Sequence, residues 1–219
     1  MNFKGIPYKT EWVEYPDIEG LYKKIGGKAA STKPDGSPYY ALPLIHDSST
    51  GAIVSDSALI AKYLDNTYPD TPKLFPTGTA PLQHAFLDMH EGTLGALWQF
   101  ALPKTHTILN PRSQEYFGRT REATFGKKLE DLVPKGEQYK VQWAKVREDF
   151  AKTDSYYQQG KEAGPYLLGN TICFGDIAYV SFVTWLKKIY GEESVEWKDI
   201  KSWNEGRLIA LVDALSKYE

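Results

Sequence analysis

Cysteine and histidine are scarce in this sequence, which limits the covalent and metal-bound frameworks that it can build. Its 219 residues include one cysteine, Cys173, and four histidines. A single cysteine excludes an intrachain disulfide and is compatible with a reducing compartment. His84 and His90 are six positions apart and do not share a helix face, and neither a His-Glu-x-x-His nor a Cys-x-x-Cys motif occurs. We therefore expect no metal site.

Long apolar runs and an excess of charge are also lacking. The longest apolar stretch, residues 177–186, is interrupted by Ser181 and Thr184 and is shorter than the roughly 20 residues of a membrane-spanning helix. Residues 1–5 carry no apolar signal segment. A formal net charge of −2 gives no indication of a nucleic-acid-binding surface. These features predict a cytoplasmic protein with neither a membrane nor a nucleic acid as its partner.

Aromatic residues, in contrast, are abundant. The chain has 6 Trp and 15 Tyr, and aromatic residues make up 14% of it. Such rings can fill a core, or they can line a cleft for aromatic ligands, because Tyr and Trp combine an apolar body with a polar tip. Composition alone leaves both interpretations open.

A proline-rich segment separates two regions with different patterns. Residues 69–80 contain Pro69, Pro72 and Pro76, a density typical of a linker. The region ahead of the linker predicts strands at 6–15, 39–46 and 52–54, helices at 17–28 and from Ser57 onward with an inner stripe of Leu59, Ile60, Tyr63 and Leu64, and a loop at 31–38. The region behind it predicts a long helix from Leu82 to Pro103, a helix starting at Pro111, a central apolar helix at 174–190 and a final helix. The order predicts a small α/β unit followed by an all-helical unit.

Two short motifs carry the strongest functional signal. Leu42-Pro43 lies in a strand-like run, where a proline belongs at an edge, a bulge or a cis bond. If the bond is cis, the backbone of Leu42 faces outward and can pair with an extended peptide. Asp56-Ser57 lies where a strand turns into a helix, whose unpaired N–H groups favour a carboxylate while the Asp56 side chain can hold an ammonium. Each motif alone is an ordinary edge proline or N-cap, but together they predict a site for a small peptide.

With these motifs in this order, the chain resembles the glutathione transferases. The runs at 5–15 and 33–38 are similar to the fungal, etherase-like branch of that family. The resemblance implies a thioredoxin-like α/β domain over 1–68, a linker over 69–80 and an all-α domain over 81–219. It also implies that the family's first strand and most of its first helix would precede Met1. The α/β domain is then incomplete at its front, and no residue inherits the catalytic Ser, Tyr or Cys that follows that strand.

The resemblance also assigns binding roles. In the family, the residue before a cis-proline pairs with the cysteinyl part of glutathione, and an acidic residue and a serine hold the γ-glutamyl end. These roles fall on Leu42, with Pro43, and on Asp56 and Ser57. Lys33 is a candidate for the glycine carboxylate, with an ordinary solvated loop lysine as the alternative.

The resemblance also implies a pocket for a second substrate and pairing with a second copy of the chain. Trp98, Phe100 and His106 are candidates for an apolar second-substrate pocket, with core or surface positions as the alternative, and the family pairs its chains as homodimers. The expected function is conjugation of glutathione to aromatic or phenolic electrophiles, or cleavage of their ethers. The alternative is a non-catalytic carrier that binds glutathione and small aromatic molecules.

One departure from the family pattern concerns a buried helix start in the second unit. The family has a Ser or Thr there, with an Asp three positions later, whereas this chain has Cys173 and Asp176. Asp176 can accept the N-cap N–H and form half of a capping box. Cys173 is either a small buried residue or a reactive thiol.

Overall fold

The computed structural model describes residues 1–33 and 35–218, so Pro34, within the run 33–38, lies outside the described part. The chain divides into two units. The first comprises Met1–Phe75 and Asn110–Tyr116, and the second comprises Pro76–Leu109 and Phe117–Glu219.

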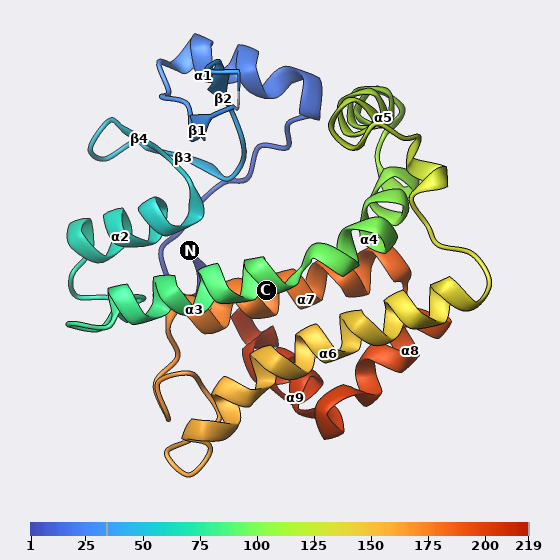
Figure 1. Ribbon diagram of the computed structural model, residues 1–219. Helices are drawn as coiled ribbons and strands as arrows, with labels where there is room; N and C mark the ends of the chain where they lie inside the picture. Colours follow the sequence, from blue (N-terminus) through green and yellow to red (C-terminus); the bar gives the residue numbers. More distant parts are fainter. Residues whose placement is uncertain (34, 219) are drawn as a thin grey trace. The chain divides into compact units, whose positions relative to one another are not determined.

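Short elements make up the first unit (Figure 1). In chain order they are η1 (Asn2–Lys4), η2 (Tyr15–Asp17), α1 (Ile18–Ile25), β1 (Ser31–Thr32), β2 (Pro38–Tyr39), β3 (Leu44–Asp47), β4 (Ala52–Ser55) and α2 (Ser57–Thr67). β1 pairs with β2 and β3 pairs with β4, both antiparallel, in separate two-stranded sheets. α2 contacts both strands of the β3–β4 hairpin, so the hairpin and the start of this helix form one local framework.

The strand predicted at 6–15 is wrong. Residues 6–14 are in no regular element, and none of β1 to β4 pairs with them. Extended backbone becomes a strand only where a neighbouring strand shares its hydrogen bonds. Side chains, rather than a neighbouring strand, provide hydrogen bonds at the C-terminal end of this segment. The Tyr15 N–H donates to Ser113 Oγ at 3.0 Å, and the Ser113 hydroxyl donates to the Glu14 carboxylate. The aromatic content of residues 6–15 does not reflect burial, because Trp12 is 93% exposed.

The strand predicted over 39–46 is two strands. β2 ends at Tyr39 and β3 begins at Leu44, and the peptide bond between Leu42 and Pro43 is cis. Proline has no N–H to give to a ladder. The interval between the strands therefore contains Leu42-Pro43, one of the two motifs that the sequence singled out for peptide binding.

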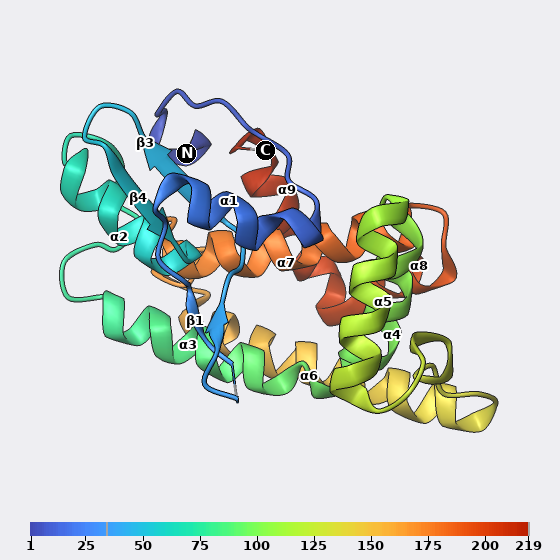
Figure 2. The ribbon, with the colours of Figure 1, turned by 90° about the horizontal axis from the view of Figure 1, so that it is seen from above.

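The second unit is all-helical. Its elements are α3 (Ala80–Thr93), α4 (Gly95–Ile108), α5 (Pro111–Phe125, of which 111–116 belong to the first unit), η3 (Leu129–Asp131), α6 (Glu137–Gly160), α7 (Phe174–Tyr190), α8 (Val195–Ser202), η4 (Trp203–Gly206), α9 (Arg207–Leu215) and η5 (Ser216–Tyr218). α7 contacts α3, α4, α8 and α9, and it runs along α3 in Figures 1 and 2. Its predicted central place in this unit is confirmed, because Val183 and Leu186 are fully buried.

Two details of the predicted helices are wrong. The first long helix breaks at Leu94 and then continues through Pro103 to Ile108. A proline inside a helix destabilises that helix by about 3 kcal/mol. The neighbouring residues Ala101, Leu102 and Thr105 are buried, so tertiary packing outweighs this local cost. In α2, Leu59 is 56% exposed and does not belong to the inner stripe.

The start of α7 is a complete capping box rather than half of one. The Cys173 N–H donates to Asp176 Oδ2 at 2.9 Å, and the Cys173 thiol lies 3.2 Å from the same oxygen. The Leu167 N–H and the Tyr157 hydroxyl donate to the other oxygen, Oδ1. Cys173 is fully buried, and burial raises the pKa of its thiol to about 12. Cys173 is therefore the small buried residue of the two alternatives, because the thiolate is the reactive form.

A buried ion pair joins the two ends of the first unit. Lys4 Nζ lies 2.6 Å from Asp65 Oδ1 and donates to the Pro72 carbonyl at 2.8 Å. Asp65 also accepts the N–H groups of Leu74 and Phe75 at 3.0 and 2.7 Å. The Lys4 side chain is 0% exposed and that of Asp65 is 8% exposed, so the pair holds η1 and α2 together out of water.

Of the helices in the described residues, none combines the length and the apolar character that crossing a membrane would demand.

Candidate functional site

The two sequence motifs lie side by side at one end of the β3–β4 hairpin. Leu44 is opposite Ser55 in the ladder, and beyond this pair the Asp56 N–H donates to the Pro43 carbonyl at 3.3 Å. Antiparallel pairing therefore brings Leu42-Pro43 next to Asp56-Ser57, although thirteen positions separate Pro43 from Asp56 in the sequence.

Asp56 performs a structural task with one of its carboxylate oxygens. Oδ1 accepts the N–H groups of Ala58 and Leu59 at 2.9 and 3.0 Å, which makes Asp56 the N-cap of α2. Its φ angle is 75° and its ψ angle is 130°, a combination outside the left-handed helical region that side-chain-bearing residues seldom adopt. Within residues 1–33 and 35–218, Oδ2 has no hydrogen-bond partner. This oxygen is available to a cation.

Ser57, the first residue of α2, is exposed. Neither its N–H nor its hydroxyl bonds to any described residue. The first N–H groups of a helix carry partial positive charge that favours an anion. A free carboxylate acceptor and two free donors thus stand at adjacent residues, which suits a group that carries an ammonium and a carboxylate together.

Leu42 presents its backbone beside this pair. The residue is 44% exposed, and its N–H and C=O make no hydrogen bond within the described part of the chain. An extended peptide could use these two groups as it would use the edge of a strand.

Tyr22 supports this segment from behind and was missed at the sequence level. The Tyr22 ring is fully buried, packs against Tyr40 at 5.2 Å between centroids, and its hydroxyl donates to the Ala41 carbonyl. A Cβ on Gly27 would approach the ring to 3.0 Å, so the absence of a side chain there makes room for it. The sequence shows Tyr22 on an apolar helical stripe with Ile18 and Ile25, but its hydroxyl contact depends on the fold.

Replacing Tyr22 with Phe is expected to destabilise the first unit by about 1–2 kcal/mol, because the Ala41 carbonyl loses a partly buried hydrogen bond. We expect the affinity for a peptide that pairs with Leu42 to fall a few-fold as well, since Leu42 is then held less firmly. Hydrogen exchange of residues 39–60 and calorimetric titration measure the two effects. Tyr8→Phe, at a 54% exposed position, is the control; equal effects from the two variants would contradict the supporting role.

Asp47 ties the far end of the hairpin to α2. Its carboxylate accepts the Ser49 hydroxyl and the hydroxyls of Tyr68 and Tyr63 at 2.7, 2.6 and 2.7 Å respectively. The Ser49 hydroxyl first, and then the two tyrosines, hold the pKa of Asp47 well below its usual range. The carboxylate thus stays ionised and fixes α2 against the hairpin that carries Pro43.

The remaining candidate residues belong to other elements of the chain. Lys33 is exposed in the turn between β1 and β2, where its N–H donates to the Ser37 carbonyl at 2.8 Å. Trp98 is half-buried beside Phe182 and Trp185 in the second unit. Phe100 is 3% exposed and packs in the core against Tyr139 and Trp143. His106 is half-buried near Phe117 and Gly118. The roles of these four residues stay predictions.

No cluster of His, Cys, Asp and Glu that could hold a metal ion occurs among the residues that the structure describes.

Comparison with known proteins gives consistent matches. The family described as glutathione S-transferase, N-terminal domain, matches residues 1–67, and the family described as glutathione S-transferase, C-terminal domain, matches residues 81–218. A glutathione S-transferase-like protein of Aspergillus flavus, ustS, is 34% identical over 227 aligned positions, which cover 96% of this chain and 78% of the relative.

Solved structures of fungal proteins are similar over the whole chain. A glutathione S-transferase of Ceriporiopsis subvermispora, solved in complex with glutathione, is 45% identical with a TM-score of 0.94, and the match covers 100% of this chain and 87% of that one. The glutathione transferase GSTFuA3 of Phanerochaete chrysosporium is 42% identical with a TM-score of 0.92, covering 100% and 86% respectively. These matches confirm the expected architecture and the fungal branch.

Proposed function

The chain belongs to the glutathione S-transferase family, and we propose that it binds glutathione at Leu42, Asp56 and Ser57 and transfers it to aromatic or phenolic electrophiles. One observation carries the assignment of the site: the hydrogen bond between the Pro43 carbonyl and the Asp56 N–H, next to Leu42, which is 44% exposed, and to the start of α2.

Five polar groups of the peptide are assigned partners of matching chemistry. Asp56 Oδ2 receives the γ-glutamyl ammonium, and the N–H and hydroxyl of Ser57 donate to the γ-glutamyl carboxylate. The N–H and C=O of Leu42 pair with the cysteinyl C=O and N–H as a short antiparallel strand. Lys33 is proposed for the glycine carboxylate.

The proposed reaction uses the thiol of the bound peptide. Its sulfur forms a bond to the electrophilic carbon, the leaving group departs with the bonding electrons, and the thiol proton passes to solvent. Trp98 and His106, which are half-buried, and Phe100, which is buried, are proposed for the second-substrate pocket. A symmetric homodimer is proposed as the assembled form.

Asp56→Asn is expected to weaken glutathione binding about 10- to 100-fold, because a charge-assisted hydrogen bond to the ammonium is lost. The substitution separates binding from capping, since Asn is as good an N-cap as Asp and has nearly the same size and shape. The free energy of unfolding should therefore change by less than about 0.5 kcal/mol. Calorimetric titration measures the affinity, and urea unfolding measures the stability.

A ligand without the amino group completes the test. Glutaryl-Cys-Gly, which differs from glutathione only in this group, should bind the original protein and Asp56→Asn equally weakly. Asp70→Asn, at an exposed position, should leave both affinities unchanged. If Asp56→Asn weakens both ligands to the same extent, the ammonium is not held by Asp56 and the assignment is wrong.

A chromogenic conjugation assay with 1-chloro-2,4-dinitrobenzene separates the two functional classes. Release of chloride and formation of the thioether above the uncatalysed rate supports the transferase. Glutathione binding without any such rate supports the non-catalytic carrier instead.

A further inference from the structure

The start of α5 is joined by a two-point ion pair to the residue that precedes α1. The Arg112 guanidinium donates to both carboxylate oxygens of Asp17, at 2.8 and 2.7 Å. Both residues belong to the first unit, which includes Asn110–Tyr116. Two parallel hydrogen bonds fix the direction of the guanidinium as well as its distance. The pair therefore sets where α1 begins relative to the start of α5.

Glu14 makes a second connection to the start of α5. Its carboxylate accepts hydrogen bonds from the Asn110 side-chain amide and the Ser113 hydroxyl. Ser113, which is 2% exposed, in turn accepts the Tyr15 N–H at 3.0 Å. A lone surface ion pair contributes little, but a bidentate pair within a network is an exception. We call this network the α5 clamp, formed by Glu14, Tyr15, Asp17, Asn110, Arg112 and Ser113.

α1 connects the α5 clamp to the proposed peptide-binding backbone. Tyr22, in the middle of α1, is fully buried, and its hydroxyl donates to the carbonyl of Ala41, the residue before Leu42. Among the described elements, η2 packs most closely against α1. The α5 clamp, which holds η2 and Asp17, is therefore the main restraint at the start of α1. A shift of this helix would move the Tyr22 hydroxyl and release the backbone at Ala41.

We propose that Arg112 is a positioning residue for glutathione: through Asp17 and α1 it holds the Leu42 backbone in the orientation that pairs with the cysteinyl part. The inference rests on the proposed function, because it concerns the same backbone groups. Arg112 acts through other residues, so its loss should lower the affinity for glutathione without removing any group assigned to the ligand.

Arg112→Met tests this role, because it keeps the stem of the side chain and removes the guanidinium. Calorimetric titration of the full chain should show glutathione binding about three- to tenfold more weakly. Arg112→Lys keeps the charge and can make one of the two hydrogen bonds, so it should recover part of the loss. In a Tyr22→Phe background, Arg112→Met should have little further effect, because the connection to Ala41 is already broken. A residue that only added stability would weaken binding equally in both backgrounds.

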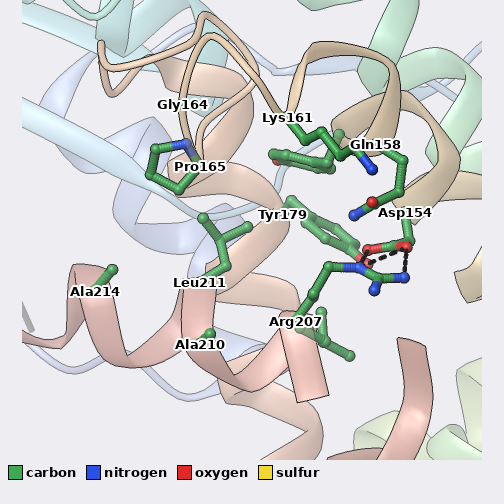
Figure 3. A pocket seen from close by; sticks show the side chains of 12 residues that line it. Asp154, Gln158, Lys161, Gly164, Pro165, Tyr179, Arg207, Ala210, Leu211 and Ala214 are labelled. Carbon is green, nitrogen blue, oxygen red and sulfur yellow. Dashed lines mark hydrogen bonds and ion pairs between the residues drawn. The ribbon is translucent and has the colours of Figure 1, made fainter. Parts of the chain in front are cut away.

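Arg207→Met is the matched control, because it also removes a guanidinium that binds a carboxylate through more than one hydrogen bond. Arg207 belongs to the second unit and donates to Asp154 Oδ2 at 2.7 Å, at the edge of a cavity lined by α6, α7 and α9 (Figure 3). This variant should leave the affinity for glutathione unchanged.

Backbone order parameters of Ala41 and Leu42, measured by ¹⁵N NMR relaxation without glutathione, separate this inference from the proposed function. They should fall in Arg112→Met and stay unchanged in Arg207→Met. If they fall but the original protein does not bind glutathione, the proposed function is wrong and the positioning of Leu42 is supported. The inference is overturned if they do not fall, if Arg112→Met binds glutathione as tightly as the original protein, or if its effect is undiminished in the Tyr22→Phe background.

Discussion

Asp65→Ala is expected to lower the free energy of unfolding of the first unit by about 3–5 kcal/mol, because it leaves the Lys4 ammonium buried without its counter-charge. The N–H groups of Leu74 and Phe75 lose an acceptor at the same time. Trp12, in this unit, is exposed and a poor reporter. Hydrogen exchange of α2, measured by mass spectrometry, is therefore the suitable measurement, and protection of residues 57–67 should fall.

The size of this effect distinguishes a buried pair from a surface charge. Asp70→Ala, at an exposed position nearby in the sequence, should change stability by less than about 0.5 kcal/mol. Lys4→Met should cost less than Asp65→Ala, because the carboxylate then keeps its two backbone donors. If Asp65→Ala and Asp70→Ala have equal effects, the pair is solvated and the explanation fails.

Lowering the pH should also weaken the stabilisation that the Lys4–Asp65 pair provides. Burial raises the pKa of Asp65, but hydrogen bonds from Leu74, Lys4 and Phe75 lower it more, so the pKa lies below its ordinary value. A carboxylate with a depressed native pKa stabilises the fold above its unfolded pKa of about 3.9 and loses this contribution as the pH falls further.

Protonation of His90 is expected to remove about 3 kcal/mol of stability from the second unit between pH 6.5 and pH 4. The residue is 4% exposed, and its Nδ1 lies 3.0 Å from Thr153 Oγ1. The rings of Tyr179 and Phe182 surround it at 4.8 and 5.5 Å between centroids. Burial lowers the pKa of His90 to about 4, whereas the unfolded chain takes up the proton near pH 6.5. Each pH unit between these values therefore costs about 1.4 kcal/mol.

Urea unfolding at pH 4 to 7.5, followed by tryptophan fluorescence, measures this loss, since Trp143 and Trp203 belong to the same helical core. His90→Asn does not titrate, and its stability should depend much less on pH in this range. His84→Asn, at an exposed position of the same helix, should keep the original dependence. A pH dependence that is the same in all three proteins would show that His90 is not its source.

The start of α2 at Asp56 and the break in the strand at Pro43 could be predicted because their signals are local. A proline in a strand-like run and an Asp-Ser before an apolar stripe each specify a backbone conformation within a few residues. The strand expected at 6–15 illustrates the opposite case. Its aromatic and β-branched residues favour extended backbone, but a strand also needs a partner, and no local pattern records whether one is there.

Local patterns in the sequence determined the order of an α/β unit and a helical unit, the position of the hairpin and the start of α2. The tertiary structure alone decided that the Pro43 carbonyl meets the Asp56 N–H, that Tyr22 holds Ala41, and that Lys4 is buried against Asp65. It also decided that α4 continues through Pro103 and that Tyr179 borders a cavity. The physical reason is the same throughout: backbone preferences act over one or two turns, whereas burial and hydrogen-bond partners are set by residues that are distant in the chain.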